Sequence, residues 1–429
     1  MIICRCKLEN RFYMNSRGKF RQTLNHQQPS NLVVDFGATP VTGIHVLLIE
    51  KLRDYYGLEK RPVRVAEPYQ MLGEIEPDLA QILGCDITGI APRTNILGFE
   101  SKNWKEFTTF WGQNVLVPGD FNTDIDGNND LLIYPAGDKS VGPSAKMPHR
   151  GFFFDTIVRQ QPYDEVNPDL NDNLEEFSLL SEADIAYWKS KTKEIEGSEK
   201  GVIANFGGTA LGDIALVPAP WMKNPRGIRS IDDWYMSTLM RPGFIAELFD
   251  RQTDIAVQNL KTLYDIIGDS IDAVYMCGAD LGTQDSQFCS PETFEQLYLP
   301  YYRKMNDWIH KNTNWKTFKH SCGAVLPLIP KFIEAGFDIL NPVQINARDM
   351  DPVVLKERFG DKITFWGGGV DTQKVLSFGT PRDVEKQVLD QCRILGKNGG
   401  FVFNTVHNAQ ANVPVENMVA LVEAIQKFR

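Results

Sequence analysis

The sequence lacks long hydrophobic runs, an excess of basic residues and a regular set of cysteines. Its apolar stretches are short, as in Val46-Leu47-Leu48-Ile49, far below the roughly 18 residues that cross a bilayer. Lysine and arginine number 45 against 55 aspartate and glutamate, and the resulting net charge of −10 has the wrong sign for neutralising phosphates. We therefore expect neither a membrane nor a nucleic acid as a partner of this chain.

The cysteines and the first residues bear on the compartment. Seven cysteines, an odd number scattered through 429 residues, do not form the pattern of a disulfide framework. Residues 1–6 contain too short an apolar stretch for a signal peptide, so we expect a cytoplasmic protein. Residues 1–13 show no periodicity and are interpreted as a loose N-terminal extension; the Cys4-x-Cys6 pair within it is a weak metal candidate, and Met14 is an alternative start.

Runs of apolar, β-forming residues that end in Gly, Asn or Pro alternate with helical patterns along the rest of the chain. Because these runs are unbroken rather than alternating, they favour parallel strands that are covered on both faces. About eight such runs predict an α/β fold, a (β/α)8 TIM barrel over residues 14–429, with a doubly wound sheet as the alternative. The runs are residues 32–37, 85–90, 201–208, 273–278, 317–323, 337–342, 363–369 and 401–407.

Two segments interrupt this alternation. Residues 115–155 contain Asp-Gly-Asn-Asn-Asp at 126–130, followed by an apolar run, which predicts an inserted β-hairpin arm. Residues 163–200 are acidic and polar, and we interpret them as a solvated helix-loop excursion.

Polar residues follow several predicted strands, where the active sites of barrels lie. His320 and Cys322 alternate on one strand, so their side chains point to the same side, about 6.5 Å apart, and can bind one zinc ion. His407 is the best third ligand and Cys392 the rival, although its helical context argues against it. The simpler alternative is a buried cysteine beside a hydrogen-bonded histidine.

Other polar residues are candidates for catalysis or for contact with a substrate. Asp280 is a general acid or base or a partner of the metal ligands. Asp35 and Asp86 are each either functional or a buried cap. The catalytic candidates are Asp280, His407, Asp35 and Asp86, and the substrate-binding candidates are Asn341, Gln344, Gln284 and Asn408.

The order of residues from 260 to 429 resembles the uroporphyrinogen decarboxylase (URO-D) superfamily, and residues 14–110 resemble it more loosely. The residues that carry the resemblance are Asp272-Ala273-Val274, Asp280, Ser290-Pro291-Glu292, Leu299-Pro300-Tyr301, Lys319-His320-Ser321-Cys322-Gly323, Gly336-Phe337-Asp338-Ile339-Leu340-Asn341, Gly369-Val370-Asp371, His407-Asn408 and Pro414-Val415-Glu416-Asn417.

The resemblance implies a (β/α)8 barrel and one of two chemistries. True decarboxylases hold a tetrapyrrole with arginines after the first strand and use an Asp, a Tyr and a late His without metal. Cobamide-dependent methyltransferases hold zinc with an H-x-C pair and a late Cys. This sequence keeps the H-x-C pair and has no Arg between residues 35 and 52. It lacks the late Cys, and His407 or Asn408 stands near the place of that residue. The methyltransferase branch is therefore the closer one.

Three hypotheses follow. The first is a zinc enzyme that moves a methyl group between a corrinoid on a partner protein and a small thiol or other acceptor, with zinc on His320, Cys322 and His407. The second is a metal-free decarboxylase of a tetrapyrrole or other carboxylated substrate, which needs arginines at the mouth, for which the candidates are Arg93, Arg226, Arg229, Arg241 and Arg348. The third is a non-catalytic corrinoid-binding barrel. The family also implies a homodimer.

Overall fold

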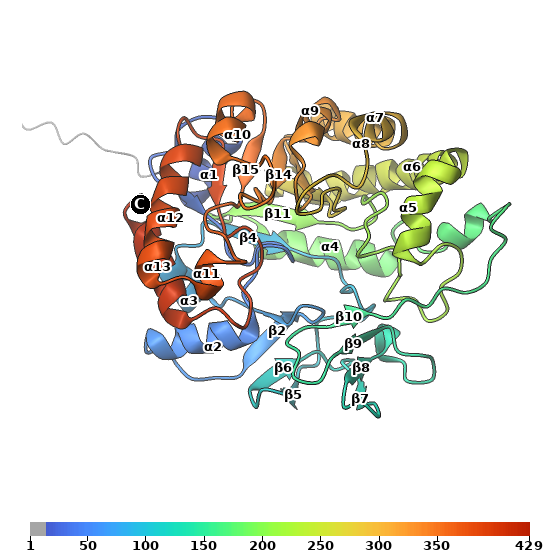
Figure 1. Ribbon diagram of the computed structural model, residues 1–429, viewed down its shortest axis with the longest axis horizontal. Helices are drawn as coiled ribbons and strands as arrows, with labels where there is room; N and C mark the ends of the chain where they lie inside the picture. The colour runs from blue at the N-terminus through green and yellow to red at the C-terminus, as the bar shows by residue number, and fades with distance from the viewer. Residues whose placement is uncertain (1–13) are drawn as a thin grey trace, which may run out of the picture.

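Eight parallel strands form the centre of the protein in a computed structural model that describes residues 14–429 (Figure 1). Hydrogen bonds join them in the order β1-β16-β15-β14-β13-β12-β11-β4. They are β1 (Val33–Val34), β4 (Ile87–Ile90), β11 (Gly201–Asn205), β12 (Ala273–Cys277), β13 (Lys316–His320), β14 (Ile339–Asn341), β15 (Thr364–Trp366) and β16 (Phe401–Phe403). Residues 1–13, with Cys4 and Cys6, lie outside the described residues, so their interpretation as an extension stays a prediction.

Asp86 brings the two outer strands, β1 and β4, together. Its backbone N–H donates to the Val34 carbonyl oxygen at 2.8 Å, and its Oδ2 accepts from the Val34 N–H at 3.1 Å. The eight strands therefore form a nearly closed barrel. Each predicted apolar run contains one of these strands, so the predicted (β/α)8 fold is confirmed.

The barrel interior is filled by side chains from alternate strand positions and by the first helix, α1 (Ser16–Leu24). Phe20 of α1 enters the N-terminal end, where its ring meets Trp366 edge to face with centroids 5.6 Å apart. Phe318 packs on the same tryptophan and stacks with Tyr275. This packing closes the lower end of the barrel, so the polar residues after the strands lie at the open, C-terminal end.

Helices surround the barrel (Figure 1). Thr380 caps α12, because its Oγ1 accepts from the Asp383 N–H and Asp383 Oδ2 accepts from the Thr380 N–H. No helix among residues 14–429 has the length and apolarity that a membrane crossing requires. The helices are α2 (Val46–Tyr55), α3 (Pro77–Leu83), α4 (Glu182–Ile195), α5 (Ile231–Met240), α6 (Pro242–Ile267), α7 (Pro291–Leu297), α8 (Leu299–Asn312), α9 (Ile329–Glu334), α10 (Pro352–Phe359), α11 (Val375–Phe378), α12 (Pro381–Leu395) and α13 (Val415–Gln426), with 3-10 turns η1 (Pro135–Gly137), η2 (Leu170–Asn173), η3 (Gly268–Ser270) and η4 (Leu326–Leu328).

The inserted arm is larger than the predicted hairpin and consists of two four-stranded sheets on one flank of the barrel (Figure 1). The predicted hairpin is present as β7 and β8, and Asp126 Oδ1 shapes its turn by accepting from the N–H groups of Asn128 and Asp130. The sheets contain β2 (Val63–Glu67), β3 (Leu72–Gly73), β5 (Lys105–Thr108) and β6 (Asn114–Val117), and β7 (Thr123–Ile125), β8 (Leu131–Ile133), β9 (Ala145–Met147) and β10 (Asp155–Thr156).

The acidic segment after the arm is less solvated than the sequence predicts. Its helix, α4, buries Trp188. Glu176, which precedes α4, forms a bidentate ion pair with the fully buried Arg229 at 2.8 and 3.0 Å. The acidic composition of this segment therefore reflects partly buried ion pairs as well as a solvated surface.

Candidate metal centre

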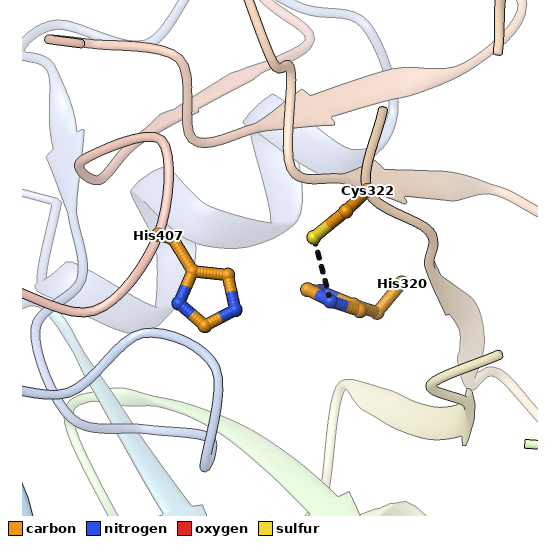
Figure 2. A group of neighbouring side chains, drawn as sticks. All are labelled: His320, Cys322 and His407. Carbon is orange, nitrogen blue, oxygen red and sulfur yellow. Dashed lines mark hydrogen bonds between the residues drawn. The ribbon is translucent and has the colours of Figure 1, made fainter. Parts of the chain in front are cut away.

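Three predicted metal ligands meet at the C-terminal end of the barrel. His320 ends β13, Cys322 lies two residues beyond it, and His407 lies in the loop after β16. One donor atom from each lies within 4.8 Å of the others, and among residues 14–429 this is the one group of three histidine, cysteine or carboxylate side chains found in such an arrangement. Figure 2 shows the two imidazoles and the thiol turned toward one another, with Cys322 Sγ 3.4 Å from His320 Nε2.

The orientation of His320 is set by Asn341 at the end of β14. Asn341 Nδ2 donates to the Trp366 carbonyl oxygen at 2.9 Å, which turns Oδ1 of the same amide toward His320. His320 Nδ1 lies 2.6 Å from that oxygen and donates its proton to it. Nε2 is then the unprotonated nitrogen, and it faces Cys322 and His407, as a metal-binding histidine requires.

The Cys322 loop is held by side chains from two other loops. The Cys322 N–H donates to Asp280 Oδ1 at 2.7 Å, and the Gly323 N–H donates to Gln344 Oε1 at 2.7 Å. Gln344 Nε2 in turn donates to Gln284 Oε1 at 3.0 Å. Asp280, Gln344 and Gln284 therefore lie at the candidate centre, and the two glutamines position the loop that carries Cys322.

Burial controls the protonation of the three ligands. It lowers the pKa of His407 to about 4, with a further lowering from His320, and it also lowers the pKa of His320. Burial raises the pKa of the Cys322 thiol well above its usual value, and Asp280 raises it further. Both imidazoles are thus neutral near pH 7, whereas the thiol needs a cation beside it in order to ionise.

The donor set fits zinc. Two neutral imidazoles and one sulfur are the nitrogen and sulfur ligands that Zn²⁺ prefers, and three protein ligands leave a fourth position for another molecule, which is typical of catalytic rather than structural zinc. Cys392, the alternative ligand, lies on α12 with its thiol buried and its pKa raised to about 12, and it is not part of the cluster.

The remaining predicted residues lie outside the cluster. Asp35 is fully buried and accepts from the Trp366 indole N–H and the Ala38 N–H, both at 3.0 Å, and burial raises its pKa to about 6. Asn408 joins two loops by accepting from the Gly43 N–H and donating to Gln70 Oε1.

The structure places Asp86 away from the other predicted catalytic residues, at the opposite end of the barrel. It precedes β4 rather than following it, and it pairs with Lys19 at 2.9 Å and with Arg429 at 2.8 Å. The sequence pattern located β4 correctly, but it did not show that Asp86 precedes this strand instead of following it. This position gives Asp86 a role in holding the N-terminal end of the barrel together.

Three residues near the centre were missed by the sequence analysis. Tyr275 points into the barrel from β12, Asp213 lies in the loop after β11, and Lys319 is buried behind His320. Lys319 Nζ donates to the carbonyl oxygens of Ala279 and His320 at 2.7 and 2.8 Å. Asp213 follows a predicted strand, so the strand-end argument could have included it, whereas Tyr275 is hidden within an apolar run.

Fold and site define this protein as a (β/α)8 barrel with a candidate metal centre at its C-terminal mouth. Residues 214–428 match the family described as uroporphyrinogen decarboxylase (URO-D), and the chain belongs to this family. The resemblance identified from the sequence is thereby confirmed.

Individual relatives are distant. The chain is 23% identical to a uroporphyrinogen decarboxylase of Pseudoalteromonas atlantica over 210 residues, which cover 46% of this chain and 56% of that protein. It is 34% identical to a uroporphyrinogen decarboxylase of Coxiella burnetii over 146 residues, which cover 32% of this chain and 37% of that protein. The chain thus spans about half or less of the length of these relatives.

A solved structure of a methyltransferase from Methanosarcina mazei shares the fold. The two structures superpose with a TM-score of 0.53 over 97% of this chain and 99% of that one, at 12% sequence identity. At this identity the likeness describes the architecture alone.

Proposed function

We propose that this protein is a zinc-dependent methyltransferase that moves a methyl group between a corrinoid, carried on a partner protein, and a small thiol or other nucleophilic acceptor. The observation that carries the proposal is the cluster of His320, Cys322 and His407, which leaves one ligand position open at a barrel mouth. A zinc ion held there would supply the Lewis acidity that favours the thiolate form of an acceptor near neutral pH.

The chain's own residues would orient the acceptor and take its proton. Asp280 lies 3.5 Å from His320 Nε2 through Oδ1, and its side chain is 32% exposed, so it can receive a proton and release it to solvent. The acceptor sulfur then forms a bond to the methyl carbon as the carbon–cobalt bond breaks, and the electron pair of that bond stays on cobalt. Asn341, Gln344 and Gln284 keep the ligands in place throughout.

The competing proposal is a metal-free decarboxylase, which the names of the curated relatives favour. A carboxylated tetrapyrrole needs bidentate partners for its carboxylates. Three of the five arginines considered for this role pair with acids of this chain: Arg93 with Glu100 and Asp184, Arg226 with Asp172 and Glu175, and Arg229 with Glu175 and Glu176.

The other two arginines do not supply such a site either. Arg241 donates to the Glu165 carbonyl oxygen and to Ser237, and the Arg348 side chain is 68% exposed beside Asp349. These contacts argue against a basic pocket among the described residues and favour the methyltransferase proposal over the decarboxylase. A barrel that binds a corrinoid without turnover is the third possibility, and it differs from the first in producing no methylated product.

The direct test is methyl transfer from methylcobalamin to a thiol, followed through the loss of the methylcobalamin absorption band and the formation of the thioether. We expect zinc-loaded wild type to catalyse the reaction and Cys322→Ala and His407→Ala to lose it. Cys289→Ala is the matched control, since Cys289 is a free thiol outside the cluster. Decarboxylation of a carboxylated tetrapyrrole by metal-free wild type, without methyl transfer, would contradict the proposal.

A further inference from the structure

The charges around the candidate metal centre point to the kind of molecule that binds there. We propose that the small molecule held at the His320–Cys322–His407 centre is neutral or cationic, and that Asp280, Asp213 and the Tyr275 hydroxyl recognise it. This inference rests on the proposed function, because it concerns the molecule that occupies the open position beside the metal. It excludes carboxylates, sulfonates and phosphates as preferred ligands.

Asp280 is the first of two acidic residues that lie beside the candidate centre. Its Oδ1 accepts from the Cys322 N–H at 2.7 Å and lies 3.5 Å from His320 Nε2, and about a third of the side chain is exposed. The charge of Asp280 acts on His320, on Cys322 and on His407. A ligand at the open position would therefore lie beside a carboxylate that already contacts His320 and the Cys322 backbone.

Asp213 adds a second, more deeply buried carboxylate. It is 7% exposed, and its Oδ1 accepts a hydrogen bond from the Ala215 N–H at 3.0 Å. Burial, and to a smaller extent Asp280, raise the pKa of Asp213 to about 6, so the group is mostly ionised at pH 7 and above. Asp213 and Asp280 thus place two carboxylates beside the centre, opposite the charge of Lys319 and that of a bound metal ion.

Tyr275 supplies a hydroxyl in the layer of side chains beneath the centre. Its ring stacks on Phe318, two residues before His320, with centroids 5.2 Å apart. The side chain is more than nine-tenths buried, and the structure shows no hydrogen bond to its hydroxyl from residues 14–429. A β-bulge after Tyr275 turns Cys277 outward, where its sulfur lies 2.6 Å from Tyr302 Oη. The Tyr275 hydroxyl is thus left as a polar group available to a ligand.

Gly278 shows that Tyr275 and Asp213 approach the same place. A Cβ atom at Gly278 would lie 2.5 Å from Tyr275 Oη and 2.6 Å from Asp213 Oδ2, closer than real contacts allow. Both oxygens therefore rest against the backbone between Cys277 and Asp280, beside the loop that carries Asp280. Because the Tyr275 hydroxyl and the carboxylates of Asp213 and Asp280 lie around the same short stretch of backbone, we infer that they form one recognition surface.

Among residues 14–429, few positively charged groups lie beside the candidate centre. Lys319 is the cation next to the candidate centre: it precedes His320 on β13, and its charge lessens the rise that burial causes in the pKa of Asp213. Lys319 is fully buried, and its Nζ donates to two carbonyl oxygens and lies 3.5 Å from Cys277 Sγ. It cannot turn toward a ligand without leaving those oxygens unpaired in the interior. An anionic ligand would face two carboxylates without a partner of its own, which is costly in a site of reduced dielectric.

The test compares three thiols of similar size on the cobalt(II)-substituted full-length protein at pH 8: 2-aminoethanethiol, 2-mercaptoethanol and 2-mercaptoethanesulfonate. Binding is read from the sulfur-to-cobalt charge-transfer band rather than from turnover. We expect the cationic thiol to bind at least about tenfold more tightly than the anionic one, with the neutral thiol between them or close to the cation. In Asp280→Asn and Asp213→Asn this preference should shrink several-fold. The control variant Arg348→Gln, which changes an exposed residue, should keep it.

The outcomes separate this inference from the proposed function. A protein that binds no cobalt or zinc would overturn the metal centre and, with it, both proposals. A protein that binds cobalt but prefers the anionic thiol, or that binds none of the three, would overturn the inference alone. Equal preferences in wild type and in both aspartate variants would show that these carboxylates do not recognise the ligand.

Discussion

The Nδ1 atom of His320 lies 2.6 Å from Oδ1 of Asn341, and this hydrogen bond determines which nitrogen of His320 faces Cys322 and His407. Asn341 is itself fixed by its second hydrogen bond, to the Trp366 carbonyl oxygen. The sequence predicted Asn341 as a residue that contacts the substrate. In the structure its amide is hydrogen-bonded at both ends, to His320 and to Trp366, and so orients a candidate metal ligand, which leads to the first prediction.

Replacing Asn341 by alanine should weaken zinc binding by about 10–100-fold, because His320 loses the partner that fixes its tautomer and ring orientation. The measurement is a competition titration of zinc against a chelator with a known affinity. Asn417→Ala is the control, since Asn417 is an equally buried amide on α13 that donates to the carbonyl oxygens of Leu376 and Gly379, outside the cluster. Equal zinc affinity in Asn341→Ala and wild type would contradict the assigned role.

Asp86 should matter for stability and not for metal binding. Burial alone would raise its pKa, but the charge of Arg429 and hydrogen bonds from Arg429, Ser16 and Lys19 lower it overall. Because Lys19 is also buried, Asp86→Ala leaves a buried charge without its partner and should reduce the free energy of unfolding by about 3–5 kcal/mol. Urea titration of both proteins measures this, and zinc content should be unchanged.

The contribution of Asp86 to the free energy of unfolding should depend on pH. A carboxyl group whose pKa is lower in the folded than in the unfolded state stabilises the fold at pH values above its unfolded pKa, about 4. The difference in unfolding free energy between wild type and Asp86→Ala should therefore be constant from pH 5 to 7 and decrease as the pH falls below about 4. A difference that grows toward low pH would show that the folded-state pKa is raised instead.

Gly278→Ala should disturb recognition while leaving the metal ligands in place. Its new Cβ meets Tyr275 Oη and Asp213 Oδ2, so one or both oxygens must move away from the ligand. We expect normal zinc content and a several-fold smaller preference for a cationic over an anionic thiol, measured on the cobalt form. Gly243→Ala is the matched control, since its Cβ enters open space. An unchanged preference in Gly278→Ala would argue against the shared surface.

Arg229 should act as a structural residue. It is fully buried against Glu175 and Glu176. Because Glu175 also pairs with Arg226, Arg229→Met leaves Glu176 without its partner and should destabilise the protein by about 3–5 kcal/mol. Arg251→Met removes an exposed pair with Glu247 on α6 and should cost less than about 1 kcal/mol. Denaturant titration compares the two variants. Loss of bound zinc in a folded Arg229→Met protein would contradict this structural role.

The barrel and the cluster of candidate metal ligands could be predicted because they depend on local patterns. Unbroken apolar runs located the eight strands, and the i, i+2 spacing brought together the side chains of His320 and Cys322, although β13 ends at His320 and Cys322 lies in the loop after it. His407 could be added because all parallel strands of a barrel end at the same mouth. These inferences need only the period of a strand and the direction of the sheet.

The features that the sequence did not reveal depend on contacts between distant segments. The parallel pairing of β2 with β6 joins segments about fifty residues apart, and short strands with mixed burial give little periodic signal. Asp86 and Asp280 are both acids beside a strand, but only the three-dimensional structure shows that they lie at opposite ends of the barrel. The side chain of Tyr275 points into the barrel and that of Cys277 points outward because of a β-bulge between them, and the apolar sequence of this strand does not predict such a bulge.

The central claim is that His320, Cys322 and His407 together hold one zinc ion, and elemental analysis of the purified protein tests it most directly. The account predicts about one zinc per chain in wild type and in Cys289→Ala, and little zinc in Cys322→Ala and His407→Ala, with all four proteins folded by circular dichroism. A wild-type protein that takes up no zinc when it is offered the metal without chelator, or variants that retain it fully, would contradict the account.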